Sequence, residues 1–139
     1  MIKVVIADDE ENVCQLIRGL IDWKSLGMEI VGVAHNGVEA LELVRTLSPD
    51  LMITDIRMPG YDGLEMIQRA KMIKDDLYFI IISGYRHFEY AQNAIKYGVS
   101  DYLLKPIKKE DFLIALNKMR ERYIQRTEQM SNEERLKQR

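Results

Sequence analysis

The chain has 139 residues, of which 47% are hydrophobic and 30% are charged, so its size fits one domain. Its 20 Lys and Arg against 22 Asp and Glu argue against a basic nucleic-acid surface and against one that coats anionic membranes. A single cysteine, Cys14, cannot form an internal disulfide, which suits a reducing cytoplasm. The apolar start is interrupted by Lys3 and matches neither a signal peptide nor a membrane span, so we expect a cytoplasmic protein without membrane attachment.

Apolar runs of strand length alternate with amphipathic stretches of helix length through most of the chain. The runs are almost continuously apolar, which is typical of parallel strands covered on both faces. The predicted strands are Lys3 to Ala7, Glu29 to Ala34, Leu51 to Thr54, Tyr78 to Ser83 and Asp101 to Leu104. Helical spacing of apolar residues predicts helices around 13–21, 38–47, 64–70, 88–95 and 112–119. This alternation predicts an α/β fold, a doubly wound five-stranded parallel sheet with helices on both faces.

The composition changes after Lys118, where the sequence becomes largely charged and polar. Leu116, Tyr123 and Met130 lie seven residues apart, so the last helix could continue as a short coiled coil. A frayed, solvated extension is favoured, since a coiled coil is normally inferred from about three or more heptads. We expect a domain over 1–122, followed over 123–139 by a charged helical extension or the start of a linker.

Polar residues stand where the predicted strands end. Ligands of open parallel sheets bind beyond the carboxyl ends of the strands, so these residues should meet at one edge of the sheet. They are Asp8, Asp9 and Glu10 after the first strand, Asp55 after the third, Ser83 at the end of the fourth, and Lys105 with Pro106 after the fifth.

Three neighbouring Asp side chains require a compensating charge, because each close pair costs about 1–4 kcal/mol. Mg²⁺, a hard cation that takes oxygen ligands, fits this need better than Zn²⁺. His35 and His87 are not expected to form a cage with Cys14, and we interpret both as surface or loop residues. Lys105 supplies a compact cation that can balance the acids and pair with a phosphoryl oxygen.

A carboxylate beside Mg²⁺, a lysine and a hydroxyl is a suitable site for phosphoryl transfer, where positioning and charge neutralisation do most of the work. Asp55 is the best candidate nucleophile because it stands alone at a central strand end and is followed by a loop. Asp8 and Asp9 are then interpreted as metal-binding residues.

Four segments together resemble the receiver domain of bacterial two-component response regulators, over residues 1 to about 122. They are D-D-E at 8–10, L-M-I-T-D-I-R-M-P-G-Y-D-G around Asp55, I-I-I-S-G-Y through Ser83, and D-Y-L-L-K-P through Lys105. The resemblance implies a flavodoxin-like strand order of 2-1-3-4-5. It also implies a sensor histidine kinase as partner and phosphorylation-dependent homodimerisation.

The resemblance further implies a role for each matching residue. Asp55 would accept the phosphoryl group, and Ser83 and Lys105 would bind it. Tyr102 would turn inward when Ser83 moves toward the phosphate. The implied Mg²⁺ ligands are Asp9, Asp55 and the backbone carbonyl of Arg57, with Asp8 acting through water.

Loop motifs narrow the resemblance. D-W-K-S-L-G-M at 22–28, D-I-R-M-P at 55–59 and S-G-Y-R-H-F-E-Y-A at 83–91 are similar to receivers attached to AraC-type DNA-binding domains. This implies transcription control, with DNA bound only through an output domain that is absent from this chain. Trp23, in the first of these motifs, is expected to anchor the loop after the first helix.

Three alternatives remain open at this point. A stand-alone receiver would relay phosphate or regulate a protein partner. A haloacid dehalogenase-like phosphatase would need a second acid two residues after the nucleophile, where this chain has Arg57. A flavodoxin-like flavin protein would need a hydroxyl- and glycine-rich phosphate loop where this chain has D-D-E-E-N. We expect a protein that catalyses its own phosphorylation and dephosphorylation but is not otherwise an enzyme.

Overall fold

Strands and helices alternate along the chain in the order predicted from the apolar pattern. The structure is a computed structural model that describes residues 1–59, 63–84 and 96–137. The predicted helix around 88–95 lies outside these residues. The elements are β1 (Ile2–Ala7), α1 (Glu11–Leu20), a short 3-10 turn (Lys24–Leu26), β2 (Met28–Ala34), α2 (Gly37–Leu47), β3 (Leu51–Thr54), α3 (Gly63–Ile73), β4 (Tyr78–Ser83), β5 (Asp101–Leu104) and α5 (Lys109–Lys137).

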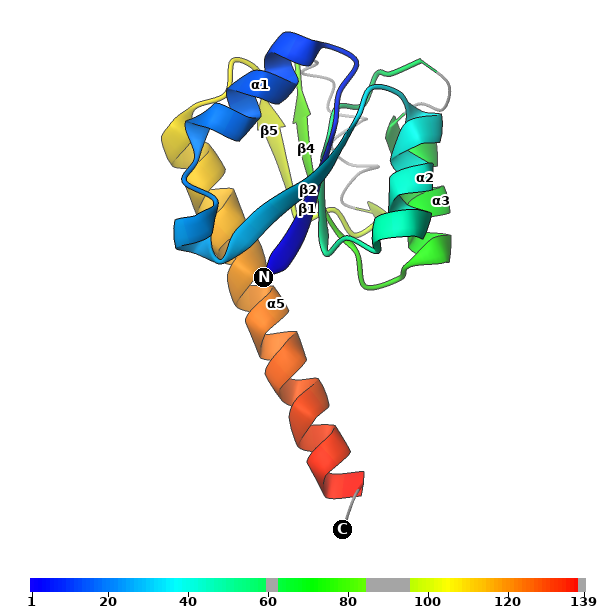
Figure 1. Cartoon of the computed structure of the whole chain (residues 1–139), viewed down its shortest axis with the longest axis vertical. Coiled ribbons are helices and arrows are strands. Elements are labelled where there is room, and N and C mark those ends of the chain that lie inside the picture. The colour runs from blue at the N-terminus through cyan, green and yellow to red at the C-terminus, as the bar shows by residue number, and fades with distance from the viewer. Residues whose placement is uncertain (60–62, 85–95, 138–139) are drawn as a thin grey trace.

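The five strands form one parallel sheet in the order β2-β1-β3-β4-β5. Helices α1 and α5 cover one face, and α2 and α3 cover the other (Figure 1). The central strand β3 is buried at every position, which explains why its sequence shows no alternation of polar and apolar residues. The predicted fold class and the strand order implied by the resemblance are confirmed.

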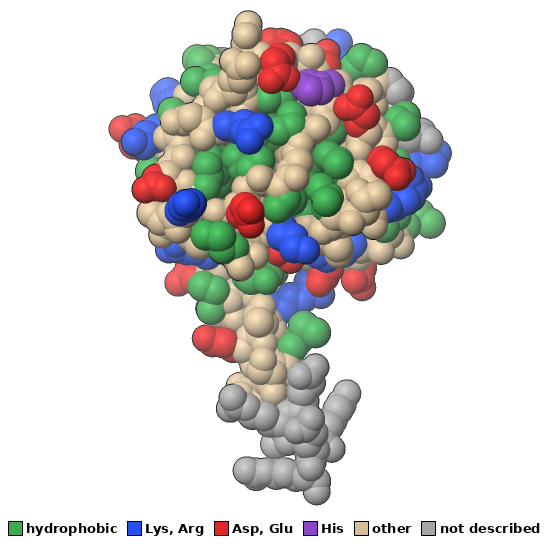
Figure 2. Space-filling view, viewed as in Figure 1, with side chains coloured by type: hydrophobic (Ala, Val, Ile, Leu, Met, Phe, Trp, Pro, Cys, Tyr) green, Lys and Arg blue, Asp and Glu red, His purple; other side chains and the backbone are tan. Residues whose placement is uncertain are grey.

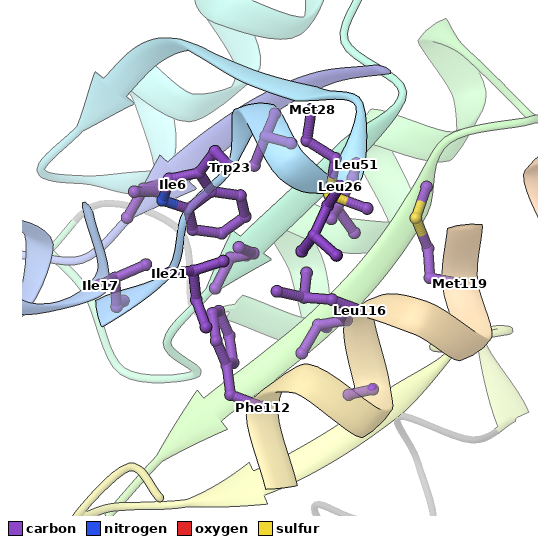
Figure 3. Packing of buried hydrophobic residues seen from close by; sticks show 14 of the residues in the cluster. Ile6, Ile17, Ile21, Trp23, Leu26, Met28, Leu51, Phe112, Leu116 and Met119 are labelled. Atoms are coloured by element: carbon purple, nitrogen blue, oxygen red, sulfur yellow. The ribbon is translucent and has the colours of Figure 1, made fainter. Parts of the chain in front are cut away.

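Aromatic residues join the core on the face covered by α1 and α5 (Figure 3). The rings of Trp23 and Phe112 meet edge to face, with centroids 5.9 Å apart and an interplanar angle of 83°. The indole N–H of Trp23 donates to the carbonyl of Arg18 over 3.1 Å. Trp23 therefore anchors the loop after α1, as predicted.

Helix α5 packs on the sheet only in its first part. Phe112, Leu116 and Met119 are fully buried at helical spacing, and Tyr123 contacts the same core. Beyond Tyr123 the helix leaves the domain (Figure 1), and Met130 is 54% exposed. The extension is thus helical as far as Lys137, while its division from the domain at 122 and any coiled-coil pairing stay predictions.

No helix within the described ranges is both long enough and apolar enough to cross a membrane.

Candidate functional site

The two adjacent central strands β1 and β3 place Asp8 and Asp55 side by side. The sheet ladder extends just past the strand ends, because the backbone N–H of Asp8 donates to Ala34 and that of Asp55 donates to Ala7, each over 3.0 Å. Because β1 and β3 pair in parallel and end opposite each other at Ala7 and Thr54, both acids emerge at the same edge of the sheet. This edge is where the sequence predicted a site.

Three carboxylates meet there, and we call Asp8, Asp9 and Asp55 the acidic cluster. Each offers an oxygen, and these oxygens lie within 4.8 Å of one another. Asp8 and Asp55 are buried, with 2% and 6% of their surface exposed, whereas Asp9 is exposed. Ionised acids are almost never buried without a partner, so the cluster requires a cation.

Lys105 is such a cation. Its ammonium Nζ lies 2.9 Å from Oδ2 of Asp55 and 3.1 Å from Oδ2 of Asp8. The backbone N–H of Lys105 donates to the carbonyl of Ser83 over 2.8 Å, which fixes the start of the lysine beside the end of β4. The lysine thus spans the sheet edge from β5 to the acids after β1 and β3.

Burial and charge act against each other in the pKa values of this site. Burial raises the pKa of Asp8, and the Glu10 N–H and Lys105 offset only part of that effect. Burial lowers the pKa of Lys105, but its hydrogen bonds to Asp55 and Asp8 and their charges outweigh burial, so this pKa is raised overall. Lys105 therefore stays protonated at neutral pH and neutralises charge in the cluster.

The two oxygens of Asp55 face different partners. Oδ1 accepts the backbone N–H of Ile56 over 2.6 Å and that of Arg57 over 3.4 Å, whereas Oδ2 accepts from Lys105. The loop after β3 therefore orients the carboxylate. Arg57 lies beside Asp55 as expected, and the role of its carbonyl stays a prediction.

Ser83 and Tyr102 lie on β4 and β5, the two strands that follow β3 in the sheet. Ser83 is fully buried at the end of β4 and is in register with Leu104 of β5. Tyr102 of β5 pairs with Ile81 of β4. Its side chain is half-buried and packs against the core under α2 and α3. Their switch roles stay predictions, and His87 lies outside the described residues.

Gly63, the first residue of α3, supports the site but was not singled out from the sequence. Its backbone N–H donates to the carbonyl of Ile56. A Cβ at this position would lie 2.6 Å from both the carbonyl oxygen of Asp55 and the Cα of Ile56. The pair Asp62-Gly63 directly before a helical apolar pattern was the available signal.

We predict that Gly63→Ala lowers the free energy of unfolding by roughly 1–3 kcal/mol, because the added methyl group must displace backbone beside Asp55. Gly19→Ala in α1 is the matched control, since a Cβ there meets nothing within 4 Å. The control should gain about 0.5–1 kcal/mol through helix propensity. Urea unfolding measures both, and equal stability of Gly63→Ala and the parent would contradict the steric explanation.

One expectation from the sequence was wrong. Cys14 and His35 were not expected to come together, yet the structure places both with Glu11, each offering a ligand atom within 4.8 Å of the others. Sequence spacing gave no signal, because His35 follows β2 while the other two residues lie on α1. Burial, followed by the charges of Asp8 and Glu11, raises the pKa of the Cys14 thiol to about 11.

Comparison with known proteins identifies the family. The model of the response regulator receiver domain matches residues 4–117. The chain belongs to this receiver family. The receiver domain of AraT, a response regulator from Geobacillus stearothermophilus, has 40% sequence identity and a TM-score of 0.86, covering 91% of this chain and 99% of that one. Membership decides against the phosphatase and flavin-protein alternatives.

Curated relatives are receivers within longer proteins. The uncharacterized transcriptional regulatory protein YesN of Bacillus subtilis is 42% identical over 119 residues, which cover 86% of this chain and 32% of that protein. The transcriptional regulatory protein HptR of Staphylococcus aureus is 37% identical over 119 residues, covering 86% of this chain and 46% of that protein. The receiver thus spans about a third to a half of these relatives.

Proposed function

We propose that Asp55 is the phosphoacceptor of a two-component response regulator and that a sensor histidine kinase supplies the phosphoryl group. The observation that carries the proposal is the Asp55 carboxylate itself. It is buried at a central strand end, oriented by backbone N–H groups through Oδ1 and by Lys105 through Oδ2. Membership of the receiver family supports the kinase as partner.

The acidic cluster fits Mg²⁺. Its donors are all carboxylate oxygens close enough to share one ion, and hard divalent cations prefer such donors. Asp8, Asp9, Asp55 and the backbone carbonyl of Arg57 would hold the ion, with Asp8 acting through water. When bound, Mg²⁺ supplies positive charge that neutralises the oxygens of the incoming phosphoryl group.

The proposed transfer is a substitution at phosphorus. A carboxylate oxygen of Asp55 attacks, a P–O bond forms, and the P–N bond to the kinase histidine breaks, with the imidazole taking a proton. Lys105 already contacts Asp55 and would shift its ammonium to a phosphoryl oxygen. Attack of water on the acyl phosphate would return the free carboxylate. The domain would catalyse these reactions on itself alone.

The phosphorylated state would be communicated through β4 and β5. The hydroxyl of Ser83 would donate to the phosphoryl group, and Tyr102 would turn inward into the space that Ser83 leaves. Ser83 ends β4, the strand beside β3, and Tyr102 lies on β5, the strand beyond β4. The change would favour a homodimer by stabilising one of two conformations.

The proposed output is transcription control in the cytoplasm, through a DNA-binding domain that would follow this chain. The descriptions of YesN and HptR as transcriptional regulatory proteins support this proposal. The receiver occupies less than half of either relative, which leaves length for an output domain.

We predict that chelation with EDTA reduces phosphorylation by acetyl phosphate to background and that added Mg²⁺ restores it. Without the cation, a dianionic phosphoryl group would approach a cluster that already carries net negative charge. Intact-mass spectrometry counts the phosphoryl groups. Undiminished labelling in EDTA would contradict the assigned role of the acidic cluster.

A further inference from the structure

A second group of metal-ligand side chains lies beside α1, and we call Glu11, Cys14 and His35 the His–Cys cluster. Glu11 and Cys14 are three residues apart on the helix and so share a face. His35 follows β2, the strand beside β1, and β1 leads into α1. One ligand atom from each residue lies within 4.8 Å of the other two.

The cluster combines one buried ligand with two that are exposed to solvent. Cys14 is 1% exposed and points its Sγ toward the carbonyl oxygen of Asp8 at 3.6 Å. The side chains of Glu11 and His35 are 59% and 44% exposed. Figure 2 shows acidic and imidazole side chains exposed together on one side of the domain. An ion could therefore enter from solvent and reach a buried sulfur.

The two ring nitrogens of His35 face two different carboxylates. Nε2 lies 2.5 Å from Oε2 of Glu11, inside the cluster, and Nδ1 lies 3.8 Å from Oε2 of Glu39 on α2. The same Glu39 oxygen accepts the backbone N–H of His35 over 2.9 Å. A carboxylate that accepts a hydrogen bond from the outer nitrogen is the usual arrangement around a metal-binding histidine. At 3.8 Å Glu39 is too far for that hydrogen bond, but it places a negative charge behind the ring.

We propose that the His–Cys cluster binds a borderline-soft divalent cation of the zinc type, at a site separate from the acidic cluster. A thiolate, an imidazole and a carboxylate are the donors that Zn²⁺ takes, whereas Mg²⁺ avoids sulfur. Three protein ligands would leave a fourth position for water. On binding, the Cys14 thiol loses its proton to solvent and exchanges its contact with Asp8 for a bond to the metal.

A simpler explanation is that Glu11 and His35 form an exposed ion pair, which contributes little stability, and that Cys14 is only a core residue. The sulfur separates the two explanations. An ion pair does not involve Cys14, whereas a metal site requires its thiolate.

The test is a Co²⁺ titration of the whole chain under reducing conditions with Mg²⁺ in excess. We expect a near-ultraviolet thiolate-to-cobalt charge-transfer band that Zn²⁺ abolishes by displacement. Cobalt bound at the acidic cluster cannot produce this band, because that cluster holds no sulfur. Absence of the band from the parent protein would overturn the proposal.

Three variants test the ligands. Cys14→Ser should lose the band. Because a buried serine can disturb folding, the surface variants Glu11→Gln and His35→Gln provide a separate test, and each should weaken cobalt binding. Thermal unfolding without metal checks that each variant is folded. A folded His35→Gln variant with unchanged cobalt affinity would overturn the assignment.

Glu39 is a positioning residue, and its test has a control on the same helix. Glu39→Gln keeps an oxygen that can accept from the His35 backbone but removes the charge behind the ring, so cobalt affinity should fall about 10–100-fold. Glu42→Gln, on α2 at an exposed position paired with Arg45, should leave affinity unchanged. Equal effects of the two variants would overturn the positioning role.

Asp55→Asn should retain the cobalt charge-transfer band, because Asp55 is not part of the His–Cys cluster. This result would show that the proposed metal site is independent of the phosphoacceptor.

Discussion

Asp55→Asn is expected to reduce phosphorylation by acetyl phosphate and Mg²⁺ from one phosphoryl group per chain to background. The amide is a far weaker nucleophile than the carboxylate, and the other two carboxylates of the acidic cluster are held differently. The oxygens of Asp8 accept hydrogen bonds from the Glu10 backbone N–H and the Lys105 ammonium, and Asp9 is exposed. Intact-mass spectrometry of parent and variant measures the effect.

The variant should remain folded, because asparagine keeps the shape of the side chain and an oxygen for the Ile56 N–H or Lys105. Asp75→Asn, at an exposed position after α3, is the matched control and should label like the parent. Labelling that survives in a folded Asp55→Asn variant would refute the phosphoacceptor assignment.

Lys105→Ala is expected to combine a stability defect with a signalling defect. Removing the ammonium leaves the carboxylates of Asp8 and Asp55 buried without their cation. Breaking a fully buried pair costs about 3–5 kcal/mol, and the Lys105 side chain is 21% exposed, so we expect a loss of about 2–3 kcal/mol without Mg²⁺. Mg²⁺ should restore more stability to the variant than it adds to the parent.

The variant should still accept phosphate but should dimerise poorly, because the ammonium that would bind the phosphoryl group is missing. Size-exclusion chromatography of the phosphorylated proteins measures dimerisation, and urea unfolding with and without Mg²⁺ measures stability. Lys74→Ala is the matched control, since Lys74 is 18% exposed and pairs with Asp50 away from the site. It should be destabilised equally with and without Mg²⁺. A phosphorylated Lys105→Ala protein that dimerises like the parent would contradict the switch role.

The sequence predicted the strands better than the ends of the helices. The third, fourth and fifth strands have the predicted bounds. β3 and β4 are buried, almost continuously apolar runs that end where polar site residues begin, and β5, the outermost strand, ends just before Lys105. Helix α5 is much longer than its apolar periodicity, which ends near Met119. Residues beyond Tyr123 lie outside the core, so no burial pattern marks where the helix ends.

The acidic cluster could be predicted because parallel topology brings all strand ends to one edge, so position along the chain implies proximity. Contacts that depend on local packing could not be predicted in this way, because no general rule of topology brings those residues together. Gly63 approaches Asp55 through the path of one loop. The proximity of His35 to Cys14 depends on how α1 packs beside the end of β2, which residue spacing does not encode.

The most direct test of the central claim is to identify the phosphorylated residue itself. Borohydride reduction of the phosphorylated chain converts an acyl phosphate of aspartate to homoserine, which peptide sequencing by mass spectrometry locates. We predict homoserine at Asp55 and unmodified aspartate at Asp8 and Asp9. Homoserine at Asp8 or Asp9 with Asp55 intact would contradict the proposal that Asp55 is the phosphoacceptor.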